Sequence, residues 1–417
     1  MPSPTPARTP APKIPKPPSP RTGLLLTGGG ARAAYQMGVL EAIADLRQAC
    51  GAGREPNPFP IITGTPAALA CGADDFDRTV RRIARVWRQF HAHQVYGADS
   101  LSVMRSGARW LTLVSLGWAL ARWRRLRPRS LLDNAPLEKL LAKMVPLMRL
   151  PRLIQKGHLT ALAVTASSYS SGEHVTFYES AQAVQPWVRS QRKAARDRIT
   201  HEHLLASSAI PFVFPAKGIT IDGHTEYFGD GSMRQSAPIA AAIHLGAERV
   251  LVIGAGRMHE PRGDSTAPPS PSYPSLAQIA GHALSNIFLD ALSVDVERVQ
   301  RINQTLSLIP EEKRTHSALR PVELLVIAPS QRLDAIAARH VGDLPGPVRT
   351  MLGALGVTSN MADVRGAALA SYLLFEQGYT QELMALGRAD TLARRADVCR
   401  FFGWKDTGAA LRTRLPT

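Results

Sequence analysis

Short apolar runs alternate along this chain with longer segments of helical spacing. Residues 31–47 repeat apolar side chains at helical intervals, and Val80, Ile83, Trp87 and Phe90 do so further on. The apolar runs predict strands at 23–27, 60–64, 160–166, 175–178, 220–222, 249–253 and 322–328. Strands that alternate with helices predict a mainly parallel sheet covered on both faces, a three-layer α/β/α fold.

Composition divides the chain into segments. Nine of the first 20 residues are proline, so residues 1–21 are expected to form a disordered or polyproline-like tail. The α/β pattern spans 22–255, with a basic helical insertion at about 90–150. Residues 256–275 are rich in Pro and Ser and predict a loop, and 276–417 predict a mainly helical C-terminal extension.

Basic residues outnumber acidic ones and are concentrated in two segments. The formal net charge is +17, and residues 1–21 and 105–129 are basic segments without a single acidic residue. A basic surface attracts anionic membranes and nucleic acids, but no nucleic-acid recognition motif is present, so we expect no nucleic acid partner. Residues 110–121 are apolar but shorter than the ~20 residues of a membrane span. Flanked by arginines, they are typical of an interfacial helix or of a helix buried under a lid.

The three cysteines, Cys50, Cys71 and Cys399, are far apart in the sequence and form no CxxC pair. The sequence therefore predicts neither a disulfide framework nor a zinc site, and we expect no metal and no cofactor. We expect no secretory signal, because the N-terminus is Pro-rich rather than apolar. These features predict a cytoplasmic protein, peripheral at the membrane if its basic segment binds lipid.

Three glycines, Gly28, Gly29 and Gly30, stand between the first predicted strand and the first predicted helix. Such a loop turns tightly and directs backbone N–H groups outward at the positive end of the helix dipole, which favours an anion. A dinucleotide-binding loop has a similar pattern. Residues 47–54, however, lack the acidic residue expected about 20 residues after such a loop.

A second motif is Asp230-Gly231-Ser232, which precedes Pro238 and the strand at 249–253. Asp-Gly alone indicates only a turn. In combination with the GGGxR loop and the segment 206–215 (ASSAIPFVFP), it resembles the patatin-like phospholipases over about residues 23–255. The C-terminal helices resemble those of bacterial members of that family.

This resemblance implies a serine lipid acyl hydrolase of the phospholipase A type. Members use a Ser–Asp dyad and a glycine-rich oxyanion hole, without a metal, on phospholipids or other acyl esters. Backbone donors aimed at a developing oxyanion contribute ~3–4 kcal/mol to such a reaction. The resemblance assigns the oxyanion loop to Gly28, Gly29, Gly30 and Arg32, the general base to Asp230, and the DG(A/G)-like motif to Asp230, Gly231 and Ser232.

The serine that should act as nucleophile is missing. In register with the family's GxSxG motif, Pro66 stands at the serine position and Ala68 at the last glycine. Proline has no hydroxyl group to donate. The nearest hydroxyls, Thr63 and Thr65, do not hold the elbow position, and Ser207, Ser208 and Ser232 lie in segments that look structural in the family.

Two events could explain the missing serine, and they differ in consequence. Either the serine was substituted in place, or about six residues were lost after Thr65. The short distance from Gly64 to Asp74 favours the deletion. We therefore expect a lipid acyl hydrolase by descent whose catalysis is lost or severely impaired, leaving a protein that binds a lipid or acyl ester. The alternative is a non-catalytic peripheral membrane protein that binds an anionic membrane surface through 105–129.

Overall fold

The structure, a computed structural model, describes residues 20–64, 67–98, 130–189, 191–221, 223–258, 275–314, 317, 319–357, 367–406 and 408. The predictions for the Pro-rich tail before residue 20, Pro66, the basic segment 105–129 and most of the loop at 256–275 lie outside these residues.

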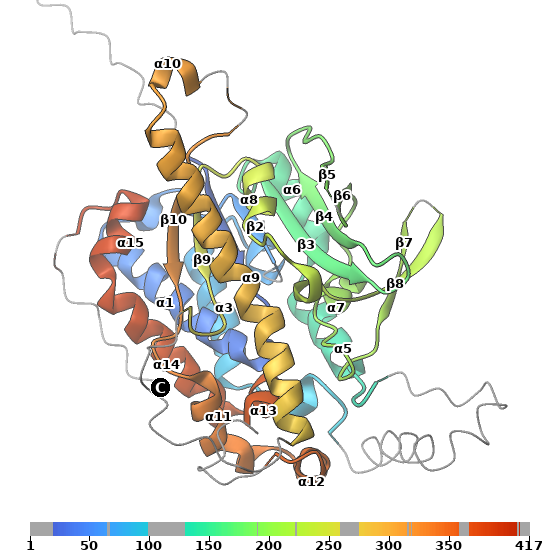
Figure 1. Ribbon diagram of the computed structural model, residues 1–417. Helices are drawn as coiled ribbons and strands as arrows, with labels where there is room; N and C mark the ends of the chain where they lie inside the picture. The colour runs from blue at the N-terminus through green and yellow to red at the C-terminus, as the bar shows by residue number, and fades with distance from the viewer. Residues whose placement is uncertain are drawn as a thin grey trace, which may run out of the picture.

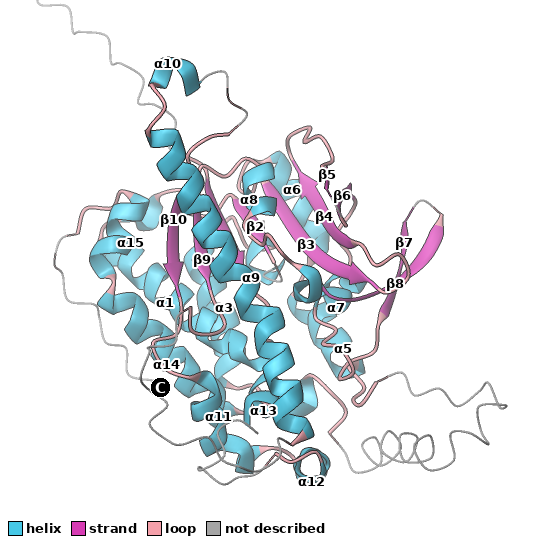
Figure 2. Cartoon of the chain, in the orientation of Figure 1, coloured by secondary structure: helices cyan, strands magenta, loops and turns pink. Residues whose placement is uncertain are grey.

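A single sheet forms the centre of the molecule (Figure 1, Figure 2). In the described ranges its strands are β1 (Thr22–Leu26), β2 (Ile61–Thr63), β3 (Ala161–Ser168), β4 (His174–Ser180), β5 (Val188–Arg189), β6 (Arg192–Arg196), β7 (Lys217–Ile221), β8 (His224–Asp230), β9 (Arg249–Ile253) and β10 (Glu323–Ile327). Their order is β10-β9-β1-β2-β3-β4-β6-β5, and β8 pairs with both β3 and β7. The five strands from β10 to β3 are parallel, and β4 and β8 are antiparallel to β3.

Four of the parallel strands, β1, β2, β3 and β9, are almost entirely buried, which is why they form continuous apolar runs in the sequence, whereas β10 at the end of the sheet is partly exposed. All of β1 is buried, with Leu24 and Leu26 in one apolar cluster and Leu25 in the other. The register pairs Leu24 with Ile62 of β2 and with Leu251 of β9. The loops after β1 and β2 therefore leave the sheet at the same edge, where sites of parallel α/β sheets lie.

Helices cover both faces of the sheet. On one face lie α1 (Ala34–Ala49), α3 (Phe76–Arg88), α7 (His201–Ser207), α13 (Ala367–Leu373) and α14 (Gln377–Ala393). On the other lie α8 (Ala240–His244) and α9 (Leu276–Ser307), and Figure 1 shows α9 crossing the sheet opposite α1. The remaining α-helices are α2 (Ala67–Ala70), α5 (Ala135–Met144), α6 (Leu150–Gln155), α10 (Glu311–Arg314), α11 (Leu333–His340), α12 (Gly346–Ala354) and α15 (Arg395–Phe402). The predicted three-layer α/β/α fold is confirmed.

The C-terminal helices are packed into the domain. β10 extends the sheet beside β9, and α14 lies along α1, where the Tyr35 hydroxyl donates to Asp390 at 2.9 Å. In the described part of the predicted helical extension at 276–417, the α-helices are α9 to α15, and β10 lies among them. Of the helices in the described ranges, none combines the length and the apolarity needed to cross a bilayer.

Candidate active site

The glycine loop connects β1 to α1 through a short 3-10 helix, η1 (Gly30–Ala33). Gly30 has a positive φ of 53°, and a Cβ atom there would lie 2.4 Å from the carbonyl oxygen of Tyr372. Both the backbone conformation and the close approach therefore require glycine at this position. The loop is thus shaped by α13, an element more than 300 residues away in the sequence.

A buried side chain of α1 holds the start of this loop. The amide of Gln36 donates to the carbonyl oxygens of Thr27, at 2.8 Å, and Ile253, at 3.1 Å. The Thr27 hydroxyl in turn accepts a hydrogen bond from the backbone N–H of Ala255 at 3.0 Å. These bonds tie the ends of β1 and β9 together and restrict the directions in which the loop N–H groups can point. The glycine motif predicted no role for Gln36, because only the fold shows which carbonyl groups its amide contacts.

Arg32 points into the protein rather than toward a substrate. Its side chain is buried, its Nε donates to the Ser371 hydroxyl at 2.7 Å, and its guanidinium lies 4.0 Å from the ring centre of Tyr372. Both partners belong to α13. Arg32 therefore braces the glycine loop through a hydrogen bond and a cation–π contact with the C-terminal helices.

Asp230 ends β8 and is 4% exposed. Its carboxylate accepts a hydrogen bond from the backbone N–H of Ser232 at 2.8 Å, which caps the 3-10 helix η5 (Gly231–Arg234). Its own N–H donates to the carbonyl oxygen of Ala209 at 3.0 Å, which links it to the segment after α7. Burial raises the pKa of Asp230 to about 6, and the hydrogen bonds from Ser232 oppose that rise.

A cavity of about 240 Å³ brings the predicted residues together. Gly28, Gly29, Gly30 and Asp230 all line it. Most of its remaining wall is apolar and comes from α1, α3 and α5, with Met37, Trp87 and Leu140 among the side chains. Asp230 has the one titratable side chain among the described lining residues. The arrangement can hold an apolar chain next to backbone donors and a carboxylate of raised pKa.

The segment after β2 also reaches this cavity. Gly64 has a φ of 102°, and a Cβ there would lie 2.2 Å from the carbonyl oxygen of Leu26. Residues 65–66 are not described, and α2, which contributes Ala67 and Ala68 to the cavity wall, is four residues long. A turn then leads to α3 at Phe76.

Four of the hydroxyl residues considered as substitutes for the serine lie in the described ranges, and they occupy different places. The Thr63 hydroxyl is buried and donates to the carbonyl oxygen of Leu24 at 3.2 Å. Ser207 and Ser208 both line the cavity, and the hydroxyl of Ser208 donates to the carbonyl oxygen of Leu204 at 2.8 Å. The backbone N–H of Ser232 donates to the Asp230 carboxylate at 2.8 Å. The cavity-lining position of the two α7-end serines was not foreseen from the sequence, because the fold alone brings that helix to the glycine loop.

The chain was compared with known proteins. The family model for patatin-like phospholipase matches residues 24–243, which include the glycine loop, the segment after β2 and Asp230. No curated protein matches the chain significantly.

Proposed function

Because this chain belongs to the patatin-like phospholipase family, we propose that it binds an acyl lipid in the cavity beside Asp230 but has lost most or all hydrolytic activity. The observation that carries the proposal is Pro66. It stands in register with the nucleophile, in the segment that leads from β2 into the cavity-lining helix α2. By family, the ancestral reaction is hydrolysis of a lipid acyl ester.

The apolar wall supports binding of an acyl chain. Each buried methylene group of a ligand contributes ~0.8 kcal/mol, so a cavity lined by Met37, Trp87 and Leu140 favours a hydrocarbon over a polar ligand. The backbone donors of the glycine loop are suited to the carbonyl or carboxylate end of such a ligand. The apolar wall and the glycine loop thus supply the groups that substrate binding and oxyanion stabilisation require.

The proton-transfer step is what fails. A carboxylate with a pKa of about 6 is suited to take a proton from a hydroxyl near neutral pH, and Asp230 has that property. Pro66 offers neither a proton nor an attacking oxygen. Without attack on the ester carbonyl no acyl-enzyme forms, and the oxyanion loop has no tetrahedral intermediate to stabilise.

The shortness of α2 supports deletion of the nucleophile segment over substitution in place. The helix has four residues and is followed directly by the turn into α3. Six further residues would add about 9 Å, or roughly one and a half helical turns. We infer that the missing length included the elbow that presented the nucleophile.

Hydrolysis of p-nitrophenyl acyl esters tests the loss of catalysis. We expect purified protein to release p-nitrophenol no faster than its Asp230→Ala variant does. A wild-type rate that exceeds background and disappears in Asp230→Ala would contradict the proposal. It would mean that another hydroxyl, with Asp230 as its base, replaces the missing serine.

Ligand binding is tested separately with a fluorescent fatty acid. Ala68→Phe places a ring at the cavity wall, and displacement of about two methylene groups should weaken binding about tenfold. Ala240→Phe is the matched control, since Ala240 is also half-buried and helical but belongs to α8 on the opposite face of the sheet. No saturable binding, or equal affinity in the two variants, argues against an acyl-binding cavity.

A second candidate function is binding to an anionic membrane through residues 105–129, whose seven arginines are not offset by any acid. Electrostatic attachment of this kind weakens as salt screens the charges. We expect flotation with vesicles that contain phosphatidylserine at low salt and its loss at high salt. The triple change Arg122→Gln, Arg124→Gln and Arg125→Gln should reduce it, and a wild-type protein that never floats would remove this function.

A further inference from the structure

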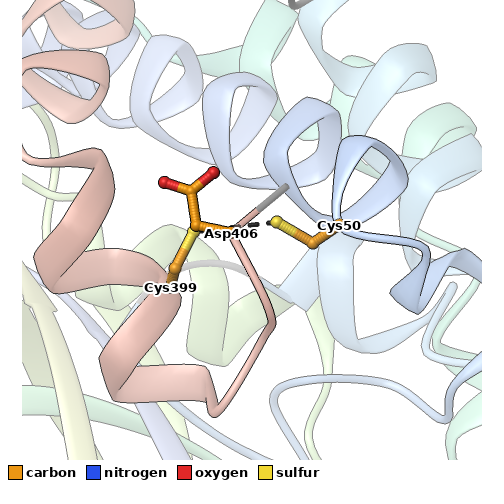
Figure 3. Close-up of side chains that lie close together, drawn as sticks. All are labelled: Cys50, Cys399 and Asp406. Carbon is orange, nitrogen blue, oxygen red and sulfur yellow. Dashed lines mark hydrogen bonds between the residues drawn. The ribbon is translucent and has the colours of Figure 1, made fainter. Parts of the chain in front are cut away.

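Two cysteines and an aspartate from distant parts of the chain meet on the side of the domain where α15 crosses the end of α1. Cys50 follows the last residue of α1, Cys399 lies on α15, and Asp406 follows that helix. The two sulfur atoms are 3.7 Å apart, and one ligand atom from each residue lies within 4.8 Å of the others. Figure 3 shows the two thiols directed toward each other with the carboxylate beside them.

We propose that Cys50, Cys399 and Asp406 bind a thiophilic divalent cation of the Zn²⁺ class. In a tetrahedral site with Zn–S bonds of about 2.3 Å, two sulfur ligands lie about 3.8 Å apart, which is close to the separation found here. Carboxylate oxygen is the third ligand type that this cation accepts. Asp406 is exposed, so a water molecule can take the fourth position.

The surroundings of Asp406 match those of a metal-ligating carboxylate. Arg395 donates to it from Nε at 3.0 Å and from a terminal nitrogen at 2.6 Å, and the N–H of Gly408 donates at 3.0 Å. Such outer hydrogen bonds orient ligands at metal sites. Two thiolates and a carboxylate carry three negative charges, which the cation and the Arg395 guanidinium together neutralise.

A disulfide is the competing use of this cysteine pair. It requires the sulfur atoms to approach to about 2.05 Å, well inside their present separation. A disulfide would also leave Asp406 paired, among the described residues, only with Arg395 and the Gly408 N–H, although its carboxylate lies within 4.8 Å of both sulfur atoms. A bound cation instead uses all three groups where they stand. It fastens α15 to the C-terminal end of α1, the helix whose other end continues from the glycine loop.

Titration of the fully reduced protein with Co²⁺, followed by competition with Zn²⁺, tests this site. We expect one ion per chain, a sulfur-to-cobalt charge-transfer absorption, and a higher melting temperature with Zn²⁺. Cys50→Ala and Cys399→Ala should each abolish the absorption, and Asp406→Asn should lower the association constant at least about tenfold. Circular dichroism establishes that each variant is folded. Of the two cysteine variants, Cys50→Ala is the less prone to unfold, because Cys50 is half-buried and Cys399 is buried.

Cys71→Ala provides the matched control. Cys71 is a free, fully buried cysteine in the main apolar cluster and is not among the three clustered residues, so its variant should bind Co²⁺ as the wild type does. Reduced protein that binds no Co²⁺ or Zn²⁺, or binding that survives Cys50→Ala, overturns the proposal. So does a Cys50–Cys399 disulfide in protein that, once reduced, takes up no metal, because the pair is then a redox pair.

Discussion

At the scale of single residues, Asp230 is held in an environment that disfavours its own charge. Its side chain is buried, and its pKa is about 6, compared with about 3.9 for an unperturbed aspartate. Between these values the folded protein binds more protons at this site than the unfolded chain does. The contribution of Asp230 to stability is therefore largest below about pH 4, falls as the pH rises to about 6 and stays low above it.

Asp230→Asn should remove this dependence. The variant keeps an oxygen that accepts from the Ser232 N–H but has no charge to bury. A shift of about two pKa units corresponds to a gain on the order of 2 kcal/mol in the free energy of unfolding at pH 7, and to no gain near pH 4. Urea unfolding of the wild type and the variant at pH 4, 5 and 7 measures this gain in the free energy of unfolding. Glu297→Gln, at an exposed position, is the control, and an unchanged pH profile in Asp230→Asn would refute the explanation.

Arg32 was assigned to the oxyanion loop from its motif, and its contacts with α13 indicate that it holds this loop in place. Ser371→Ala removes the acceptor of the buried Arg32 Nε–H and should destabilise the protein by about 1–3 kcal/mol in urea unfolding. Ser208→Ala is the control, because the Ser208 hydroxyl also donates to a carbonyl of its own helix. If the two changes lower the free energy of unfolding equally, the hydrogen bond from Arg32 to Ser371 stabilises the protein no more than a hydrogen bond within one helix does.

At the scale of elements, the connection from β2 through α2 to α3 decides whether activity can be restored. If the elbow was deleted, Pro66→Ser places a hydroxyl on a segment too short to present it. We expect neither Pro66→Ser nor Pro66→Ser combined with Ala68→Gly to hydrolyse p-nitrophenyl esters above background. A rate gained by either variant and lost again on Asp230→Ala would instead indicate substitution in place.

The strands differ in how well the sequence predicts them, for a physical reason. All seven predicted strands overlap an observed strand, namely β1, β2, β3, β4, β7, β9 and β10. The signal is clearest for β1, β2, β3 and β9, because strands buried on both faces need uninterrupted apolar residues. β8, with the sequence HTEYFGD, was not predicted as a strand, since its first half is largely exposed and polar. It nevertheless carries Asp230. The residue was found through its motif, and the element that positions it only through the structure.

At the scale of the whole molecule, the C-terminal segment completes the domain that the family model only partly covers. The model ends at residue 243, whereas β10 extends the sheet and α14 lies along α1 beyond that point. α13 supplies Ser371 and Tyr372 to Arg32. The site therefore depends on residues outside the matched region.

A cut after residue 266, in the Pro- and Ser-rich stretch, tests this dependence. The fragment 1–266 expressed alone leaves Arg32 without its α13 partners and the apolar face of α1 without α14, so we expect it to be insoluble or to bind the dye ANS strongly. Co-expression with 267–417 should return a soluble complex that purifies together. A soluble, cooperatively unfolding fragment 1–266 would show that the C-terminal segment is a separate unit.

The sequence by itself determined the family and the alternation of strands and helices, and from it we predicted the oxyanion role of the glycine loop, the role of Asp230 and the register that places Pro66 at the nucleophile position. These are properties of short stretches, where periodicity and motif spacing are visible without any partner. Only the tertiary structure decided that the loop and Asp230 line one cavity, that Arg32 turns toward α13, and that Cys50 meets Cys399. Those contacts join residues about 200 to 350 positions apart, and such pairs are chosen by packing of the whole core, which local patterns do not encode.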